Sequence, residues 1–355
     1  MESHSVRKAL SIALRLIILA VLVALAIWKT DVSSLFGYFN LRIGAYMLLL
    51  QPLAFMCAVF LAKRYSVLLQ SAEVKFGTAF KAIVLSNGLN VVLPARLSEV
   101  LKATYVNEKT GHSVSEALSA VVLERIGDII ILLLLALACL GSVLLRVDAL
   151  YVSVLGLVIV GSLGLLVGTE KTILGLASRL RFRMLSRFLH QFVSHAASSL
   201  RSRSFYVGQL YGMLAWTCSF VLMVVFIYLA GSIRIGLSQS LLLFTATTVG
   251  LLIPLLPGGI GTYEAAAIYV LRGYGFGFEE ALVLALALHM SQLAFFFVGS
   301  LIIVSSERIG VIALVKRIGV FMDRNGEGNG TPDQTETDAT ARLGWTQEQH
   351  ESRSD

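Results

Sequence analysis

The chain contains 355 residues, of which 56% are hydrophobic and 14% charged, and its mean hydropathy is +0.79. When Tyr is left out of the apolar set and Gly is added, the apolar share is about 61%, whereas soluble domains average ~45–50%. A water-soluble fold of this length could not bury so much apolar surface. The composition therefore excludes an ordinary soluble domain and indicates a membrane protein with a formal net charge of +7.

The apolar residues gather in long segments, the first of which extends from Leu16 to Trp28. Further charge-free segments cover residues 43–62, 129–145, 149–169, 204–233, 235–263 and 281–306. About 20 apolar residues span ~30 Å of hydrocarbon, so several of these segments are long enough to cross a bilayer. Because none of them alternates with a period of two residues, we predict an all-α polytopic membrane protein rather than a β-barrel.

Two features near and within these segments have simple interpretations. The A-x-A-like sequence at residues 24–26 is similar to a signal-peptide cleavage site. We nevertheless predict a retained membrane helix, because the repeat described below requires it. The three cysteines, Cys57, Cys139 and Cys218, match no disulfide or metal spacing and are expected to pack in the membrane.

The charge is divided unevenly along the chain. Residues Asp323–Asp355 contain eight acids and three arginines, a net charge of −5, which leaves +12 for residues 1–322. This polar stretch lacks aliphatic periodicity, so we predict a disordered acidic tail in the cytoplasm. The connector at residues 171–203 contains seven basic residues and no acid. By the positive-inside rule it faces the cytoplasm, where we expect it to lie on anionic headgroups.

The position of this connector limits the number of crossings. If every hydrophobic segment crossed, the five crossings before residue 171 would place the connector outside, against the positive-inside rule. The conflict disappears if Phe76–Val106 enters and leaves on the same side. The same treatment of Gln239–Leu271 keeps the C-terminus in the cytoplasm with the N-terminus.

The resulting prediction is a membrane domain at residues 1–322 with two re-entrant helical hairpins and six crossings. The crossings lie near residues 10–28, 43–62, 118–145, 149–169, 205–230 and 281–305. Two units, about 10–145 and about 149–305, repeat the order crossing, crossing, hairpin, crossing in opposite orientations. Inverted repeats with broken segments are typical of secondary transporters, which bind substrate near the midplane.

Each predicted hairpin turns at a Leu-Pro pair that is followed by a glutamate. The first turn reads LPARLSE (Leu93–Glu99) and the second LPGGIGTYE (Leu256–Glu264). The turn residues that we assign to the tips are Pro94, Pro257, Gly258, Gly259 and Gly261. Proline ends the incoming helix and glycine permits a tight reversal, so both tips are structural turns at least.

The charges near these tips indicate more than a turn. Arg96, Glu99 and Lys102 follow fourteen uncharged residues, and Glu264 lies between charge-free runs of 29 and 7 residues. One interpretation is that the glutamates complement the dipole of the outgoing helix. A charge at the bilayer centre costs about 3 kcal/mol, however, and usually faces a polar cavity on a transport pathway. We therefore favour a transport function for Glu99 and Glu264.

A further charged cluster opens the segment after the first hairpin. Glu124 and Asp128 share a helical face at i, i+4, and Arg125 can reach Asp128 at i, i+3. This cluster either locks its helix with an internal salt bridge or lines a headgroup cavity together with Arg96. In the last crossing, His289 and Gln292 lie one turn apart and either line a polar path or form interhelical hydrogen bonds.

Three stretches together resemble a known family. They are NGLNVVLPARLSEVLKATYV (Asn87–Val106), VVLERIGDIIILLL (Val121–Leu134) and LPGGIGTYEAAA (Leu256–Ala267). Their order is similar to the signature stretches of the lysylphosphatidylglycerol synthase transmembrane-region family, also described as the flippase-like domain family. The resemblance extends over residues 10–320 in length and hydropathy. Ser98 stands where the family usually has Gly, and Lys102 where it often has Arg.

The resemblance implies translocation of a lipid, with charged family positions at Arg96, Glu99, Arg125, Asp128 and Glu264. Well-understood members join this membrane unit to a soluble aminoacyltransferase. About 33 residues follow the membrane part here, too few for that domain, so we expect a stand-alone member that is not an enzyme. It would need no cofactor or metal and would bind a phospholipid or glycolipid headgroup rather than nucleic acid.

We therefore expect a multi-pass lipid translocase of the cytoplasmic membrane. Arg96 and Arg125 would hold a headgroup phosphate, while Glu99, Asp128 and Glu264 would balance those charges or bind a cationic headgroup substituent. Two alternatives stay open: a lipid-modifying transferase with Glu99 or Asp128 as general base, and a non-transporting scaffold of an envelope-synthesis complex. A homo-oligomer or an envelope-synthesis partner is also open, and no ATPase motif is present in the sequence.

Overall fold

The computed structural model describes residues 41–93, 97–143, 183–252 and 257–307. Within these ranges the chain forms helices joined by turns, and no strand. Several predictions fall outside the described residues. They are the crossings at 10–28 and 149–169, the connector as far as residue 182, the tail at 323–355, and the tip residues Pro94 and Arg96.

The described helices follow the predicted segments closely. The first half contains α3 (Leu41–Leu49), α4 (Gln51–Leu69), α5 (Phe76–Leu89), α6 (Leu97–Thr110) and α7 (Val114–Val143). The second half contains α10 (Arg183–Arg201), α11 (Arg203–Ala230), α12 (Leu237–Leu252), the 3₁₀ turn η1 (Pro257–Gly259), α13 (Thr262–Gly273) and α14 (Phe278–Ser306). Three stretches, Leu41–Leu69, α11 and α14, are long and apolar enough to cross a membrane.

Both predicted hairpins are present as pairs of short helices that pack together, α5 with α6 and α12 with α13. The second tip is built as the glycines predict, because Gly258, Gly259 and Gly261 have φ angles of 69°, 73° and 88°. These left-handed conformations are open to glycine at little cost. Entry and exit from the same side of a membrane stays a prediction for both hairpins.

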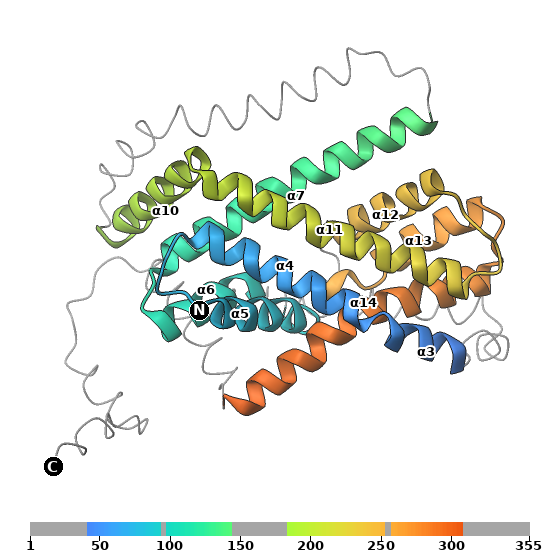
Figure 1. Ribbon diagram of the computed structural model, residues 1–355, viewed down its shortest axis with the longest axis horizontal. Coiled ribbons are helices and arrows are strands. Elements are labelled where there is room, and N and C mark those ends of the chain that lie inside the picture. The colour runs from blue at the N-terminus through green and yellow to red at the C-terminus, as the bar shows by residue number, and fades with distance from the viewer. Residues whose placement is uncertain (1–40, 94–96, 144–182, 253–256, 308–355) are drawn as a thin grey trace, which may run out of the picture.

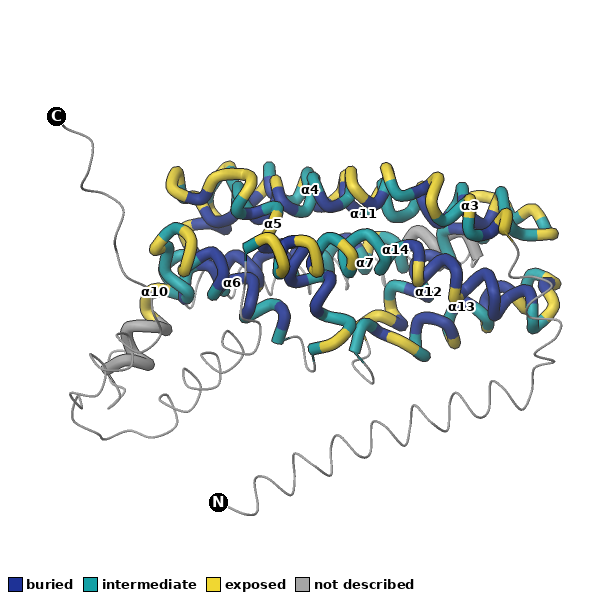
Figure 2. Tube along the Cα trace, turned by 90° about the horizontal axis from the view of Figure 1, so that it is seen from below, coloured by how far each residue is buried: buried dark blue, intermediate teal, exposed yellow. Residues whose placement is uncertain are grey.

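The helices are arranged in layers. α4 and α11 lie side by side in one layer, and the hairpins occupy a second layer beside them, toward opposite ends of the long axis (Figures 1 and 2). α5 packs against α14, and α12 packs against α7. α6 packs against α7, and α13 against α14. If α5, α6 and α7 are exchanged with α12, α13 and α14, each of these packing pairs becomes another pair of the same set.

Two hydrophobic clusters hold the halves together. The first joins buried residues of α4, α5, α6 and α7, including Tyr65 and Leu101. The second joins α3 with α11 to α14 and includes Phe226 and Tyr263. Large apolar side chains are also exposed on the outer surface, among them Tyr269. Such a surface suits a protein surrounded by lipid, where the exposed side chains contact acyl chains.

α10 is an amphipathic helix docked against α7 and α11. Its buried face includes Val193, Ala196 and Ala197. His195 fixes this face, because its Nδ1 lies 2.5 Å from the Ser119 hydroxyl and its Nε2 lies 3.3 Å from the Leu69 carbonyl oxygen. Burial lowers the pKa of His195, although the bond to the carbonyl acts in the opposite direction.

Candidate functional site

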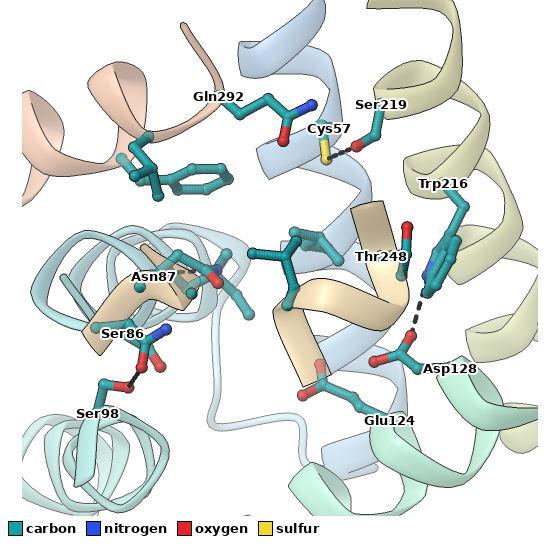
Figure 3. A pocket seen from close by; sticks show the side chains of 18 of the residues that line it. Cys57, Ser86, Asn87, Ser98, Glu124, Asp128, Trp216, Ser219, Thr248 and Gln292 are labelled. Atoms are coloured by element: carbon teal, nitrogen blue, oxygen red, sulfur yellow. Dashed lines mark hydrogen bonds between the residues drawn. The ribbon is translucent and has the colours of Figure 1, made fainter. Parts of the chain in front are cut away.

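A cavity of about 440 Å³ lies between the two hairpins, bounded by α4, α7 and α11 (Figure 3). One part of its lining is charged and contains Arg64, Glu99, Lys102, Glu124, Arg125 and Asp128. The other part is apolar and includes Leu53, Ile83, Leu132, Leu222, Leu251 and Phe296. The cavity therefore offers ionic partners and hydrocarbon contacts to the same ligand.

The tips of the two hairpins meet at this cavity. Gly258 and Gly259 of the second tip line it, together with Asn87, Asn90 and Ser98 around the first tip. A Cβ placed on Gly258 would lie 3.5 Å from the Cα of Val91. Segments about 165 residues apart in sequence thus approach each other within van der Waals contact, as expected for hairpins that converge at one site.

Arg64 on α4 organises the charged part of the lining, although only 1% of its side chain is exposed. Its Nη1 donates to Asp128 Oδ1 at 2.6 Å, and its Nη2 donates to the Glu124 carbonyl oxygen at 2.5 Å and to Gln209 Oε1 at 3.1 Å. Two glycines make room for this guanidinium. A Cβ on Gly212 would lie 3.0 Å from Arg64 Cζ, and one on Gly127 would collide with the Gln209 amide.

Lys102 and Glu124 form a second buried pair next to Arg64. Lys102 Nζ lies 2.5 Å from Glu124 Oε2, and the two side chains are 3% and 4% exposed. The ammonium group also lies 4.2 Å from the centre of the Tyr65 ring, a cation–π contact. This pair joins α6 of the first hairpin to α7 in a place where neither charge could remain alone.

Arg125 is the most open cation of the cluster, with 41% of its side chain exposed. Its Nε lies 3.2 Å from Glu99 Oε1, and its Nη1 donates to Asp128 Oδ2 at 3.0 Å. The second contact confirms the predicted i, i+3 pair. Trp216 Nε1 donates to the other oxygen of Asp128 at 3.1 Å. Figure 3 shows Asp128 and Trp216 on one side of the cavity, with Ser86, Asn87 and Ser98 on the other.

Among the described residues, the cluster contains three cations and three carboxylates. Each ion has an opposite charge within 3.2 Å. Arg125 could exchange its hydrogen bond to Asp128 for one to a bound anion, because Asp128 keeps its pair with Arg64. Arginine suits this exchange, since its planar fork matches phosphate geometry.

Glu264 and His289 form a separate pair that does not line this cavity. His289 Nδ1 lies 2.7 Å from Glu264 Oε1, and the two side chains are 3% and 11% exposed. The backbone N–H of Gly261 donates to Glu264 Oε2 at 2.6 Å, as expected for an acid near a helix N-terminus. The Tyr263 ring stacks on the imidazole with centroids 4.2 Å apart.

The structure thus distributes the predicted residues over two places. Glu99, Lys102, Glu124, Arg125 and Asp128 lie around the cavity, together with the second-tip glycines Gly258 and Gly259. Of the predicted polar pair in α14, His289 bonds Glu264 and Gln292 lines the cavity and donates to the Tyr263 hydroxyl at 3.5 Å.

Sequence reasoning missed Arg64, which follows Lys63 at the end of an apolar run and has the position of an ordinary positive flank. It also missed Asn87, Asn90 and Trp216. The signal for the asparagines was available, because both lie in an otherwise apolar stretch before the first tip.

The sequence matches the protein family described as "Lysylphosphatidylglycerol synthase TM region" over residues 12–299. This match spans more than half of the chain and includes both hairpins and the charged cluster. No curated protein and no solved structure matches the chain.

Proposed function

The chain belongs to the lysylphosphatidylglycerol synthase transmembrane-region family, and on this premise we propose that it is a lipid translocase. It moves a phospholipid or related polar lipid across the cytoplasmic membrane, in which it is a multi-pass protein. The headgroup passes through the charged cavity between the hairpin tips, and no bond of the lipid is made or broken.

The observation that supports this proposal is the division of the cavity lining. A polar lipid has a charged headgroup and long acyl chains, and the lining has a cluster of six ionised side chains beside an apolar wall. Ionisable residues inside membrane domains are costly and usually mark pathways. Here the cost is offset by mutual pairing, and Asp128 can give up Arg125 to a phosphate because it keeps its pair with Arg64.

We assign the phosphate to Arg125, because it is the more exposed of the two described arginines that line the cavity. Glu99 and Asp128 release Arg125 when the phosphate arrives, and they bind any cationic substituent of the headgroup. Arg64 and Lys102 stay paired with Asp128 and Glu124, and they keep the carboxylates in place.

Movement of a lipid across the membrane requires that the cavity open to each leaflet in turn. The symmetric exchange of packing pairs between the two halves supports a structural repeat. We propose that the repeat is inverted, with the hairpins re-entering from opposite sides. Rocking of one half against the other would open the cavity alternately to each leaflet, while the acyl chains stay in lipid. Both termini then lie in the cytoplasm.

The basic connector at 171–203 provides contact with the cytoplasmic leaflet. In its described part, α10 buries an apolar face on α7, whereas His190 and Arg201 are exposed. Arg203 directly after it is exposed as well. We propose that this outer face lies on anionic headgroups.

Reconstitution into liposomes with a fluorescent phospholipid tests the proposal. The purified protein should accelerate the exchange of lipid between leaflets, measured by chemical quenching of the outer label. Arg125→Gln and Glu99→Gln should each slow this exchange by about tenfold or more, because each removes a charge that the proposed site uses to bind the headgroup.

Glu73→Gln is the matched control, since Glu73 is exposed between α4 and α5 and far from the cavity lining. Exchange that continues unchanged in both cavity variants would remove the cavity from the pathway. A chemically altered lipid would instead favour a transferase. A folded protein that neither exchanges nor alters lipid would favour a scaffold.

A further inference from the structure

The chain builds the same acid–base pair twice, at equivalent positions of its two halves. Glu99 and Glu264 are each the third residue of the helix that leaves a hairpin tip, α6 and α13. Their partners Arg125 and His289 are each the twelfth residue of the next helix, α7 and α14. This correspondence indicates that the second pair is the counterpart of a cavity site.

The two pairs differ in their cation and in their access. In the first, Arg125 keeps its charge at every physiological pH, and the pair opens to the cavity. In the second, the same position holds a histidine, a side chain that can be either neutral or cationic. This pair is closed, and His289 Nε2 is buried without a hydrogen-bond partner among the described residues.

The surroundings of His289 provide one counter-charge. α14 packs against α3, α4, α5, α11 and α13, and Glu264 is the single carboxylate in these five helices. The phenol of Tyr263 stacks on the imidazole. The cationic side chains of the same helices are Arg42, Lys63, Arg64, Lys81, Arg203 and Arg272, of which Arg64 pairs with Asp128 and Lys81 with Glu307. The protonated pair is therefore neutral overall, whereas the deprotonated pair leaves one buried negative charge.

The pair is connected to the moving part of the site. Glu264 Oε2 accepts a hydrogen bond from the Gly261 N–H, and Glu264 Oε1 lies 2.7 Å from His289 Nδ1. The same carboxylate therefore contacts both His289 and the glycine turn of the second tip. That turn includes Gly258 and Gly259, which line the cavity, and a Cβ on Gly258 would lie 3.5 Å from Val91 Cα of the first tip. A buried carboxylate that loses its counter-charge favours a wetter arrangement, because desolvation then costs more than pairing returns.

We propose that Glu264 and His289 form a proton-binding site that couples lipid movement to protons, a role that rests on the translocase function proposed above. His289 Nε2 takes up one proton to give an imidazolium paired with Glu264, and this state keeps the second tip closed. Release of that proton leaves the carboxylate alone and opens the second tip. One proton thus binds and leaves in each transport cycle.

Proteoliposomes with a pH step across the membrane test this coupling. Lipid exchange by the wild-type protein should change by about fivefold or more relative to symmetric pH, within the usual range of coupling between sites. A pH dye enclosed in the vesicles should record proton movement that depends on the transported lipid. His289→Arg recreates the first pair in the second half and should make exchange insensitive to the pH step.

His289→Gln removes the charge altogether and should also abolish the sensitivity, so the test does not depend on one variant folding. Glu73→Gln, at an exposed carboxylate between α4 and α5 that does not line the cavity, is the matched control and should respond as the wild type does. Wild-type exchange that ignores the pH step, with no proton movement, would overturn the coupling and leave the translocase intact.

A measurement without transport separates the two proposals. NMR of the histidine side chains in detergent should show a His289 resonance that titrates in the wild type and shifts its midpoint in Glu264→Gln. If no lipid exchange occurs but this titration is present, the translocase function fails and the proton site stands. A His289 resonance that does not respond to pH overturns the proton site.

Discussion

The two hairpins of this protein have the same construction and different surroundings. Each places a glutamate at the third position of its outgoing helix, opposite a basic residue at the twelfth position of the following helix. Around Glu99 the chain adds Arg64 and Lys102 with their carboxylate partners, and the result is an open network. Around Glu264 it adds Tyr263 and a glycine turn, and the result is a closed pair.

This difference shows how two hairpins with the same construction can have two different functions. A network of several paired ions can lose one contact and keep the rest, which suits a site that must bind and release a charged ligand. A single buried pair has no substitute partner, so its state is decided by one proton. We infer that the first hairpin binds and the second controls access.

The largest expected effect concerns the orientation of the two halves. Gly77 at the start of α5 and Gly273 at the end of α13 are exposed, and a Cβ at either glycine meets no neighbouring atom within 4 Å. In a cysteine-free background, Gly77→Cys should react with an impermeant maleimide only from the cytoplasm, and Gly273→Cys only from outside. Opposite entry of the hairpins requires this all-or-none difference.

Labelling of both positions from one side would contradict the inverted repeat. The background requires replacement of Cys57, Cys139 and Cys218 by serine or alanine, and its lipid exchange is measured first because Cys57 lines the cavity. Each cysteine is first replaced singly by serine, and the lipid exchange of each variant is measured before either glycine is changed.

The next effect concerns the stability of the network. Lys102→Met leaves Glu124 buried and unpaired, so the free energy of unfolding should fall by about 3–5 kcal/mol. The double variant Lys102→Met/Glu124→Leu removes both charges and should recover most of this loss. Thermal unfolding in detergent measures both. Lys75→Met, at an exposed lysine before α5, is the control, and equal losses in the single and double variants would contradict the pairing.

A smaller effect should distinguish the cost of the left-handed backbone at the second tip from the cost of its tight packing. Gly259 and Gly111 have similar φ angles of 73° and 72°, but only Gly259 has a close neighbour, Leu251 Cδ2, 2.6 Å from an added Cβ. Gly111→Ala should therefore cost about 1 kcal/mol for the left-handed backbone alone. Gly259→Ala should cost about 2 kcal/mol and also slow lipid exchange, because the added methyl group narrows the cavity. Equal costs and normal exchange would show that the tip is not tightly packed.

Much of the helix layout could be predicted from sequence, because hydropathy and turn residues are local signals. The breaks at Leu93 and Pro257 follow from a proline that removes an N–H and from glycines that permit reversal. The i, i+3 bond between Arg125 and Asp128 follows from helix geometry alone. These features need no knowledge of the tertiary fold.

The network around Arg64 could not be predicted in the same way. Its burial depends on Gly127 and Gly212, which come from different helices and give space only when α4, α7 and α11 pack together. The role of Lys102 depends likewise on Glu124, which lies on another helix. The equivalence of Arg125 and His289 was present in the spacing of the chain, but it has meaning only once both are seen opposite their glutamates.

The smallest expected effect lies at the base of the first hairpin. Glu307, directly after α14, accepts hydrogen bonds from Lys81 Nζ at 2.6 Å and from the Tyr105 hydroxyl at 3.0 Å, and it lies 2.9 Å from Lys109 Nζ. Partial burial raises the pKa of Glu307, but these partners outweigh it and lower the pKa to about 2. The stabilisation is therefore present above about pH 4.3 and is lost as the pH falls toward about 2.

Glu307→Gln should lower the free energy of unfolding by about 1 kcal/mol at neutral pH, because both lysines are nearly half exposed and solvent weakens their attraction. Thermal unfolding as a function of pH measures this effect against Glu73→Gln, whose exposed carboxylate should contribute nothing comparable. The wild-type and Glu307→Gln curves should converge in acid, since protonated Glu307 and glutamine are both uncharged. A constant gap down to the lowest pH would mean that the side chain stabilises the hairpin base by shape and not by charge.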